Sequence, residues 1–370
     1  MKIAFVTSLN GGVGKFTFSL IDKLCLKKDI VQIDIYGFLD QRRIPIPELK
    51  EKVNIVKLFS HPLSLLFWLI RNLDKMGFYD LIHINHASFI WPFLILKFVH
   101  KNIKIVFSSR TAYIFEHVKA IEAFSFMFDM FSFPIASRLA DAHTTFSHFN
   151  RRSLKQRFGA NPIVIYNGID RSKFHFSMKK RELTRKKLGI GDDNLLILYL
   201  GLLLPYKNVL DLIDVMPYVL KEIPSTKLLI VGRGPSLNEI INRVYQLGIS
   251  DKVIIKTEFV KDTADFYSAA DIFVFPAADG THVLLEAMAC GLPIIYAYSC
   301  SSPEIVGDAG LSFQIHNQKE LCEKILTLAR NESLKEKKRM EALARIRHFD
   351  WKEIAEKYYE LYVNVLRKRR

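Results

Sequence analysis

The chain of 370 residues has few cysteines and no long uninterrupted apolar run. Its four cysteines, Cys25, Cys290, Cys300 and Cys322, form no CxxC pair and have no histidine pair nearby, so neither structural zinc nor a disulfide framework is expected. No apolar stretch approaches the roughly 20 residues of a membrane-spanning helix. The first residues, MKIAFVTSLNGG, are too short an apolar segment for a signal peptide. We therefore expect a protein of the reducing cytoplasm.

Basic residues outnumber acidic ones, 53 to 38, which gives a formal net charge of +15. Such an excess favours anionic partners, namely nucleic acid, anionic lipid headgroups or phosphorylated substrates. No helix-turn-helix, zinc-finger or RNP pattern accompanies the charge, so we do not expect a nucleic-acid partner. A generally basic surface and a membrane-facing basic patch both remain open. The length is sufficient for two or three domains with separate cores.

The segment DIFVFPAADGTHVLLEAMACGLP, residues 271–293, predicts a strand, a tight loop and a buried helix. Ile272–Phe275 is the apolar, β-branched and aromatic strand, Thr281 is a candidate helix cap, and Val283–Cys290 is the helix, closed by glycine and proline. In open α/β sheets the loop of such a unit carries ligands. Glu286 is the exception on this apolar helix. Its carboxylate must be paired, hydrogen-bonded or turned toward a polar ligand, because burying it bare costs several kcal/mol.

This segment resembles the donor-binding signature of the family 4 retaining glycosyltransferases, in which two glutamates flank a glycine-containing turn and an LLEAMACGLP helix. The second glutamate of that family binds the ribose of the sugar nucleotide, a role that the resemblance gives to Glu286. Asp279 takes the place of the first glutamate, near the transferred sugar, with one fewer intervening residue. The resemblance therefore implies that Asp279 and Glu286 are the catalytic carboxylates and that Gly280 and Thr281 contact the donor.

The second half of the chain supplies further candidates for the donor site. The strand Leu195–Gly201 leads into a loop with Lys207, which the resemblance assigns to the donor diphosphate, whereas Leu202 stands where the family has an arginine. The strand Lys227–Val231 precedes Gly232-Arg233-Gly234-Pro235, which predicts a helix start. The two glycines let the backbone approach a ligand, the helix N-terminus favours an anion, and Arg233 supplies a cation. Asp262 closes the loop that the resemblance assigns to the nucleotide base.

At the N-terminus, Lys2–Thr7 predicts a strand, Leu9–Lys15 a glycine loop, and Phe16–Leu26 a helix. The sequence GGVGK allows two interpretations. It is similar to a phosphate-binding P-loop, although Leu9 and Phe16 replace the glycine and the hydroxyl residue of that motif. In family 4 glycosyltransferases a glycine-rich loop after the first strand lies over the donor phosphates. We favour the second interpretation, in which Gly11 and Gly12 contact the donor.

Strands at residues 31–36, 53–57 and 80–85 alternate with apolar helical stretches such as 62–73, which predicts a parallel βαβ sheet. The strand Lys104–Ser108 leads to Arg110, at the position of a functional histidine in the family. Arg110 is therefore a candidate contact for the acceptor or the sugar, and a surface arginine is the alternative. The phenylalanine-rich stretch 120–135 predicts a helix that serves either as core packing or as a membrane contact.

The segment Ile163–Asp170, IVIYNGID, with Phe174 beyond it, resembles the element that ends the first domain of this family. We therefore expect residues 1–172 to form an N-terminal Rossmann-like, acceptor-side domain and residues 173–349 a C-terminal, nucleotide-sugar-binding one. A C-terminal helix at about 350–370 is expected to cross back to the first domain. The fold class implied is α/β, with two Rossmann-like domains facing a cleft, the GT-B-type architecture.

The resemblance implies transfer of a sugar from a nucleotide-diphosphate-sugar to a glycan or lipid-linked acceptor, with retention of configuration and without a metal or other cofactor. Two alternatives stay open: a P-loop-type ATPase built on GGVGK, and a non-catalytic homologue that binds sugar nucleotides. The departures at Leu202, Arg110 and Asp279 are the reason for the second alternative. The expected location is the cytoplasm, with peripheral contact to the anionic inner face of the membrane.

Overall fold

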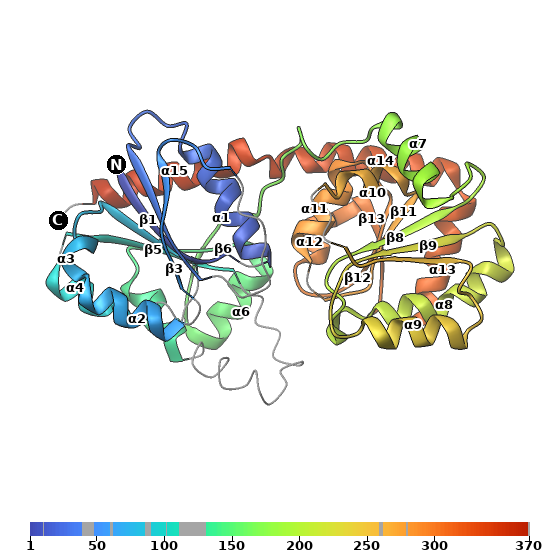
Figure 1. The fold of residues 1–370 in the computed structure, drawn as a ribbon, viewed down its shortest axis with the longest axis horizontal. Coiled ribbons are helices and arrows are strands. Elements are labelled where there is room, and N and C mark those ends of the chain that lie inside the picture. Colours follow the sequence, from blue (N-terminus) through green and yellow to red (C-terminus); the bar gives the residue numbers. More distant parts are fainter. Residues whose placement is uncertain are drawn as a thin grey trace. The chain divides into compact units, whose positions relative to one another are not determined.

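The computed structural model describes residues 1–9, 11–38, 48–59, 62–85, 90–100, 102–110, 131–258, 262–278 and 280–368. The chain divides into two compact units (Figure 1). Unit 1 consists of Met1–Gly168 and Trp351–Arg370, and unit 2 of Ile169–Asp350. The boundary lies at Gly168/Ile169, four residues before the predicted end of the first domain. The end of the chain returns to unit 1.

Unit 1 is built on a seven-stranded sheet of order β3-β2-β1-β4-β5-β6-β7, in which every pairing is parallel. Five of its strands were predicted from their apolar runs, and the structure confirms them. The strands of this sheet are β1 (Lys2–Ser8), β2 (Gln32–Phe38), β3 (Val53–Phe59), β4 (Leu81–Ile84), β5 (Lys104–Ser109), β6 (Ala142–Thr145) and β7 (Ile163–Val164).

The two faces of this sheet pack against different helices, because successive side chains of a strand point in opposite directions. In β1, Ile3 and Phe5 belong to the core under α1 (Gly11–Leu24) and α15 (Trp351–Arg367). Ala4 and Val6 belong to the opposite core. The helices on that side are α2 (Pro62–Arg71), α3 (Leu73–Met76), α4 (Trp91–Val99), residues 131–139, and α6 (His148–Phe158).

The N-terminal glycine segment of unit 1 forms part of a helix. Helix α1 begins at Gly11, so the predicted glycine loop 9–15 is wrong. Residues 11–15 form the first turns of the helix. The glycine at position 14 permits this, because a Cβ there would lie 2.2 Å from the Leu9 carbonyl oxygen. Of the stretch 120–135, only residues 131–135 are described; Phe131 is exposed and Phe133 is buried in the core.

Unit 2 is built on a six-stranded parallel sheet of order β10-β9-β8-β11-β12-β13. Its strands are β8 (Leu196–Leu200), β9 (Lys227–Val231), β10 (Val253–Lys256), β11 (Ile272–Phe275), β12 (Ile294–Ala297) and β13 (Gly310–Phe313). Its helices are α7 (Met178–Leu188), α8 (Val209–Glu222), α9 (Leu237–Gln246), α10 (Ala264–Ala269), α11 (Thr281–Ala289), α12 (Ser302–Val306), α13 (Gln318–Arg330) and α14 (Glu332–Arg345), with 3₁₀ turns η3 (Pro205–Lys207), η4 (Gly307–Ala309) and η5 (Ile346–Phe349).

In each sheet the strand order reverses at one place, between β1 and β4 in unit 1 and between β8 and β11 in unit 2. Loops that leave the carboxyl ends of neighbouring strands diverge there, and open parallel sheets bind ligands in the resulting crevice. The two-domain Rossmann-like prediction is confirmed for each unit by itself. Among the described residues, no helix combines the length and apolar character needed to span a bilayer.

Candidate active site

The crevice of unit 2 lies at the carboxyl ends of β8 and β11. The loop after β8 is tied to the loop after β11 by Asn208, whose Nδ2 donates to the Pro276 carbonyl at 3.2 Å. Asn208 adopts a left-handed backbone, with φ of +51°, between η3 and α8. Just before it, the Lys207 ammonium lies 5.7 Å from the centroid of the Phe275 ring. Lys207 thus lies where the strand order reverses, and its contact with a donor diphosphate stays a prediction.

Gly280 makes the approach to α11 possible. A Cβ at this position would lie 1.9 Å from Phe275 Cζ, so a side chain cannot be added without displacing the ring. The prediction of Thr281 as the helix cap is wrong: Gly280 is the N-cap and Thr281 is the first helical residue. Thr281 Oγ1 is buried and has no hydrogen-bond partner among the described residues. The first turn of α11 therefore offers a buried hydroxyl and its orphan amides.

The loop after β9 packs directly on the loop after β8. A Cβ on Gly232 would lie 1.9 Å from the Gly201 carbonyl oxygen, and one on Gly234 would lie 2.2 Å from that of Leu203. The carbonyl oxygen of Arg233, between the glycines, accepts a hydrogen bond from the Leu203 N–H at 2.9 Å, whereas the Arg233 side chain is exposed. Both glycines are needed for close backbone contact. The guanidinium remains at the surface of the loop.

The predicted helix start at the GRGP turn is wrong by two residues. Helix α9 begins at Leu237, and Ser236 is its N-cap. The glycines are held against the β8 loop, so the helical path starts only after Pro235. Ser236 Oγ is buried without a hydrogen-bond partner among the described residues, and so is Ser302 Oγ at the start of α12. With Thr281, three helix starts that follow β9, β11 and β12 carry such a hydroxyl.

Glu286 is buried on α11, with 3% of its surface exposed. Its Oε2 accepts a hydrogen bond from the Tyr267 hydroxyl of α10 at 3.0 Å, so the predicted need for a partner is met within unit 2. Burial raises the pKa of Tyr267 well above its usual range, and the Glu286 charge adds to the effect. The sequence gives no signal for Tyr267, because this residue lies 19 positions before Glu286 with no motif around it. Contact of Glu286 with a donor stays a prediction.

Asp262 lies at the start of α10. Its carboxylate pairs with the Lys180 ammonium at 3.1 Å and accepts the Ala264 N–H at 3.2 Å. Burial alone would raise the pKa of Asp262, but these hydrogen bonds outweigh it and hold the pKa below its ordinary value. Asp262 is therefore ionised and held in place, and its role toward a nucleotide base stays a prediction. Asp279 lies outside the described residues.

In unit 1, Arg110 follows the carboxyl end of β5. Its guanidinium carbon lies 3.2 Å from the centroid of the Phe16 ring of α1. Nη1 donates to Asn167 Oδ1 at 2.7 Å, and Nη2 donates to the Tyr358 hydroxyl of α15. Burial lowers the pKa of Arg110, and the charges of Tyr358 and Tyr362 act against this shift. In the same unit, Gly11 and Gly12 are the first two residues of α1, and both are exposed.

Next to Arg110, a chain of buried hydrogen bonds links α15 with the strands β6, β5 and β4. The Tyr358 hydroxyl is 3.2 Å from Thr144 Oγ1, which is 2.6 Å from Ser108 Oγ. Ser108 in turn is 2.7 Å from His83 Nε2, and His83 Nδ1 is 2.5 Å from the Tyr362 hydroxyl. The two tyrosines of α15 thereby anchor this C-terminal helix to the sheet. This network holds the residues around Arg110 in place.

Two family models match the chain. One, described as glycosyl transferases group 1, matches residues 180–347, and the other, described as Glycosyltransferase Family 4, matches residues 10–173. The chain belongs to the family 4, group 1 glycosyltransferases. The two matches fall on unit 2 and unit 1 respectively, so the family covers both sheets.

Similar proteins include a GDP-mannose-dependent monoacylated alpha-(1-6)-phosphatidylinositol monomannoside mannosyltransferase of Corynebacterium glutamicum, 31% identical over 201 residues, which are 51% of this chain and 52% of the relative. The chain spans about half the length of the curated relatives it matches. Two solved structures share the fold of this glycosyltransferase. Sucrose-phosphate synthase of Thermosynechococcus elongatus is 20% identical, with a TM-score of 0.81 over 99% of both chains. Anabaena HepE, solved with UDP-glucose, is 21% identical, with a TM-score of 0.79 over 98% of this chain and 100% of HepE.

The P-loop alternative is not supported in this glycosyltransferase. Thr17 is the hydroxyl residue that would have to replace the one missing at position 16. Thr17 is fully buried. Its Oγ1 donates a hydrogen bond to the Val13 carbonyl at 2.9 Å, lies 2.9 Å from Thr7 Oγ1, and accepts a hydrogen bond from Asn85 Nδ2 at 2.9 Å. A hydroxyl engaged in this way cannot bind a magnesium ion on a nucleotide. The described residues also contain no cluster of His, Cys, Asp and Glu suited to a metal.

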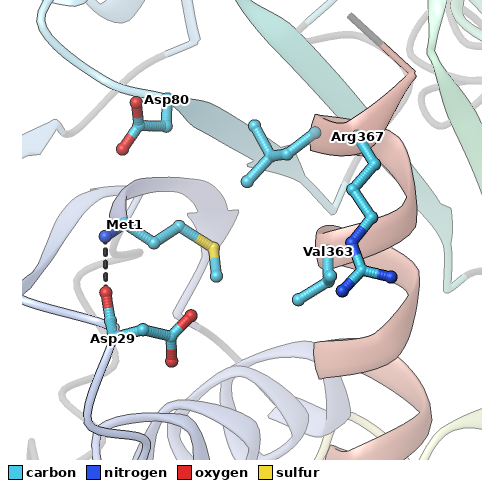
Figure 2. A pocket seen from close by; sticks show the side chains of 6 residues that line it. Met1, Asp29, Asp80, Val363 and Arg367 are labelled. Carbon is cyan, nitrogen blue, oxygen red and sulfur yellow. Dashed lines mark hydrogen bonds between the residues drawn. The ribbon is translucent and has the colours of Figure 1, made fainter.

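A cavity of about 350 Å³ lies in unit 1, near the amino end of β1 (Figure 2). Met1 and Asp29 line one side, Asp80 precedes β4, and Val363 and Arg367 come from α15. The Met1 ammonium donates to the Asp29 carbonyl. Parallel sheets bind ligands at the opposite edge, where the strands end. We assign no part of the glycosyltransferase site to this cavity.

Proposed function

We propose that this glycosyltransferase transfers a sugar from a nucleotide-diphosphate-sugar to a glycan or lipid-linked acceptor with retention of configuration. The observation that carries the proposal is the crevice of unit 2. There Lys207 and the start of α11 lie where the strand order reverses, and the glycines of the β9 loop and the start of α9 pack against the loop after β8. Cations and helix N-termini bind a diphosphate, and the buried hydroxyls at these helix starts need polar partners. A nucleotide-diphosphate-sugar donor supplies both the diphosphate and polar partners for these hydroxyls.

In the proposed reaction the bond between the sugar C1 and the diphosphate oxygen breaks, C1 bonds to the acceptor hydroxyl oxygen on the same face, and the hydroxyl proton passes to the departing diphosphate. Lys207 and the helix amides stabilise the negative charge that develops on the diphosphate, so no metal is required for this task. Glu286, held by Tyr267, binds a ribose hydroxyl. Asp279 stabilises the positive charge that develops at the sugar, and Arg233 and Asp262 complete the donor contacts.

The predicted site residues of unit 1 contact both substrates. Gly11 and Gly12 approach the donor phosphates, and Arg110 contacts the acceptor or the sugar. Stacking on Phe16 and the bonds to Asn167 and Tyr358 hold the Arg110 guanidinium in one orientation. Relatives support the substrate classes, since one is a GDP-mannose-dependent phosphatidylinositol monomannoside mannosyltransferase and a solved structure contains UDP-glucose. A lipid-linked acceptor suits a cytoplasmic protein in peripheral contact with the membrane.

Nucleotide sugars that include UDP-glucose and GDP-mannose should be screened by thermal shift, because a bound donor stabilises the fold by mass action. The donor found is then used in a transfer assay with Asp279→Asn. We expect donor affinity to change little and turnover to fall by roughly 100-fold, an electrostatic effect of a few kcal/mol. A donor that binds without any turnover in the wild type would favour the non-catalytic homologue. Intact turnover in the variant would leave Asp279 as a turn residue.

A further inference from the structure

Helices α2 and α4 are apolar on the side that faces away from the sheet. In α2, Leu65 and Leu69 are buried in the core, whereas Phe67 and Ile70 are 62% and 43% exposed. A surface helix of a globular protein normally carries polar residues on its outer face. The sequence PLSLLFWLIR instead has Ser64 and Arg71 as its only polar side chains.

Helix α4 repeats the arrangement. Its sequence WPFLILKFV has a buried side with Phe93 and Leu96, and an outer side on which Ile95 is 42% and Val99 is 52% exposed. The two helices contact each other and lie on the same face of the sheet (Figure 1). Among the described residues, Phe67, Ile70, Ile95 and Val99 are the large apolar side chains that this helix pair exposes, and we call them the α2–α4 surface. Apolar surfaces of this kind mark places where another molecule docks.

The charge of the chain is concentrated in the unit that carries this surface. Unit 1 contains 28 basic and 15 acidic residues, a net charge of +13, whereas unit 2 contains 25 and 23, a net charge of +2. This division could not be seen from the total alone. An anionic partner is therefore attracted to unit 1 and much less to unit 2.

Basic side chains also border the α2–α4 surface. The exposed Lys57 ammonium lies 5.7 Å from the centroid of the Trp68 ring of α2, and exposed Arg71 ends that helix. Lys75 on α3 is exposed too, and Asp74 is the one exposed acidic residue within α2, α3 and α4 in the described structure. Exposed apolar side chains with cations beside them match the interface of an anionic bilayer, where acyl chains lie beneath phosphate headgroups.

We propose that the α2–α4 surface docks on an anionic lipid bilayer. Phe67, Ile70, Ile95 and Val99 enter the boundary between headgroups and acyl chains, and Lys57 and Arg71 contact the headgroup phosphates. A second copy of the chain is a poorer occupant, because its unit 1 carries the same net positive charge. The docking does not rest on the proposed sugar transfer, since it concerns only the helices of unit 1 and can be measured without substrate.

Co-sedimentation with vesicles tests the apolar part. We expect the wild type to bind vesicles that contain phosphatidylglycerol, to bind phosphatidylcholine vesicles weakly, and to dissociate as salt is raised. The double variant Phe67→Ser/Ile95→Ser should bind at least about tenfold less well. The matched control Tyr245→Ser/Ile241→Ser removes side chains that are 80% and 47% exposed on α9 and should bind like the wild type. Equal binding by the two double variants would overturn the proposal.

The charge contribution is tested by Lys57→Glu/Arg71→Glu, which should weaken binding strongly at low salt and little at high salt. Lys186→Glu/Lys221→Glu changes the net charge equally but alters exposed residues of unit 2, and should have little effect. In the wild type, brominated anionic lipid should quench tryptophan fluorescence, since Trp68 and Trp91 lie on the two helices. Absence of quenching, or a dimer in ultracentrifugation that Phe67→Ser dissociates, would show that the surface does not dock on lipid.

Discussion

The buried pair Tyr267–Glu286 allows a quantitative test of the site in unit 2. The Tyr267 hydroxyl donates to the carboxylate at 3.0 Å, and 3% of Glu286 is exposed. A hydrogen bond to a charged group contributes about 1.5–3 kcal/mol, and one between neutral groups about 0.5–1.5 kcal/mol. Tyr267→Phe should therefore lower the free energy of unfolding of unit 2 by about 1.5–3 kcal/mol in the wild-type background, and by about 1 kcal/mol less in the Glu286→Gln background.

The assay must separate the two units, and the tryptophans make this possible. All three, Trp68, Trp91 and Trp351, lie in unit 1. Urea unfolding followed by far-UV circular dichroism reports both units, whereas tryptophan fluorescence reports unit 1. The expected shift should appear in the dichroism transition and leave the fluorescence transition unchanged. Equal costs of Tyr267→Phe in both backgrounds would refute the view that this hydroxyl stabilises a buried charge. Donor binding to Glu286→Gln should also be weaker, because half of the acceptor capacity is lost.

Three further predictions concern other parts of the molecule. Lys207→Ala should weaken binding of a nucleoside diphosphate by about 1.5–3 kcal/mol in calorimetric titration, and unchanged affinity would remove Lys207 from the site. Burial lowers the pKa of His143 to about 3, below the roughly 6.5 of an unfolded histidine, so the unfolded state takes up the proton first as the pH falls. This histidine should contribute a loss of about 2 kcal/mol to the stability of unit 1 between about pH 7 and pH 5, measured by tryptophan fluorescence in urea as the difference between the wild type and His143→Gln. Calorimetry should detect no magnesium-dependent ATP binding at the GGVGK segment, and tight binding would restore the P-loop alternative that depends on Lys15.

The strands, the class of fold and the family could be predicted from sequence because they depend on local patterns. Apolar, β-branched runs such as Ile272–Phe275 become buried strands wherever they lie in a parallel sheet. The helix with Glu286 was recognisable because a carboxylate is out of place among apolar residues. Alternation of strands and helices similarly implied parallel sheets, since parallel neighbours require a crossover.

Helix starts were less predictable, because they depend on what the backbone packs against. The glycines at 11–14 indicated a loop, yet α1 begins at Gly11, since the small residue at 14 fits against the Leu9 carbonyl. Thr281 was expected to cap α11 but is its first helical residue, because the ring of Phe275 leaves room only for Gly280 before it. Steric contact between separate strands and loops decided these boundaries.

Residue types and short spacings are therefore sufficient to predict the strands, the family signature and the total charge. Which distant side chains meet depends instead on the fold. Tyr267 reaches Glu286, Tyr358 of the C-terminal helix reaches Arg110, and α2 and α4 place their exposed apolar residues on one surface. No local pattern encodes these contacts, because they arise when the order of strands in the sheet brings remote segments together.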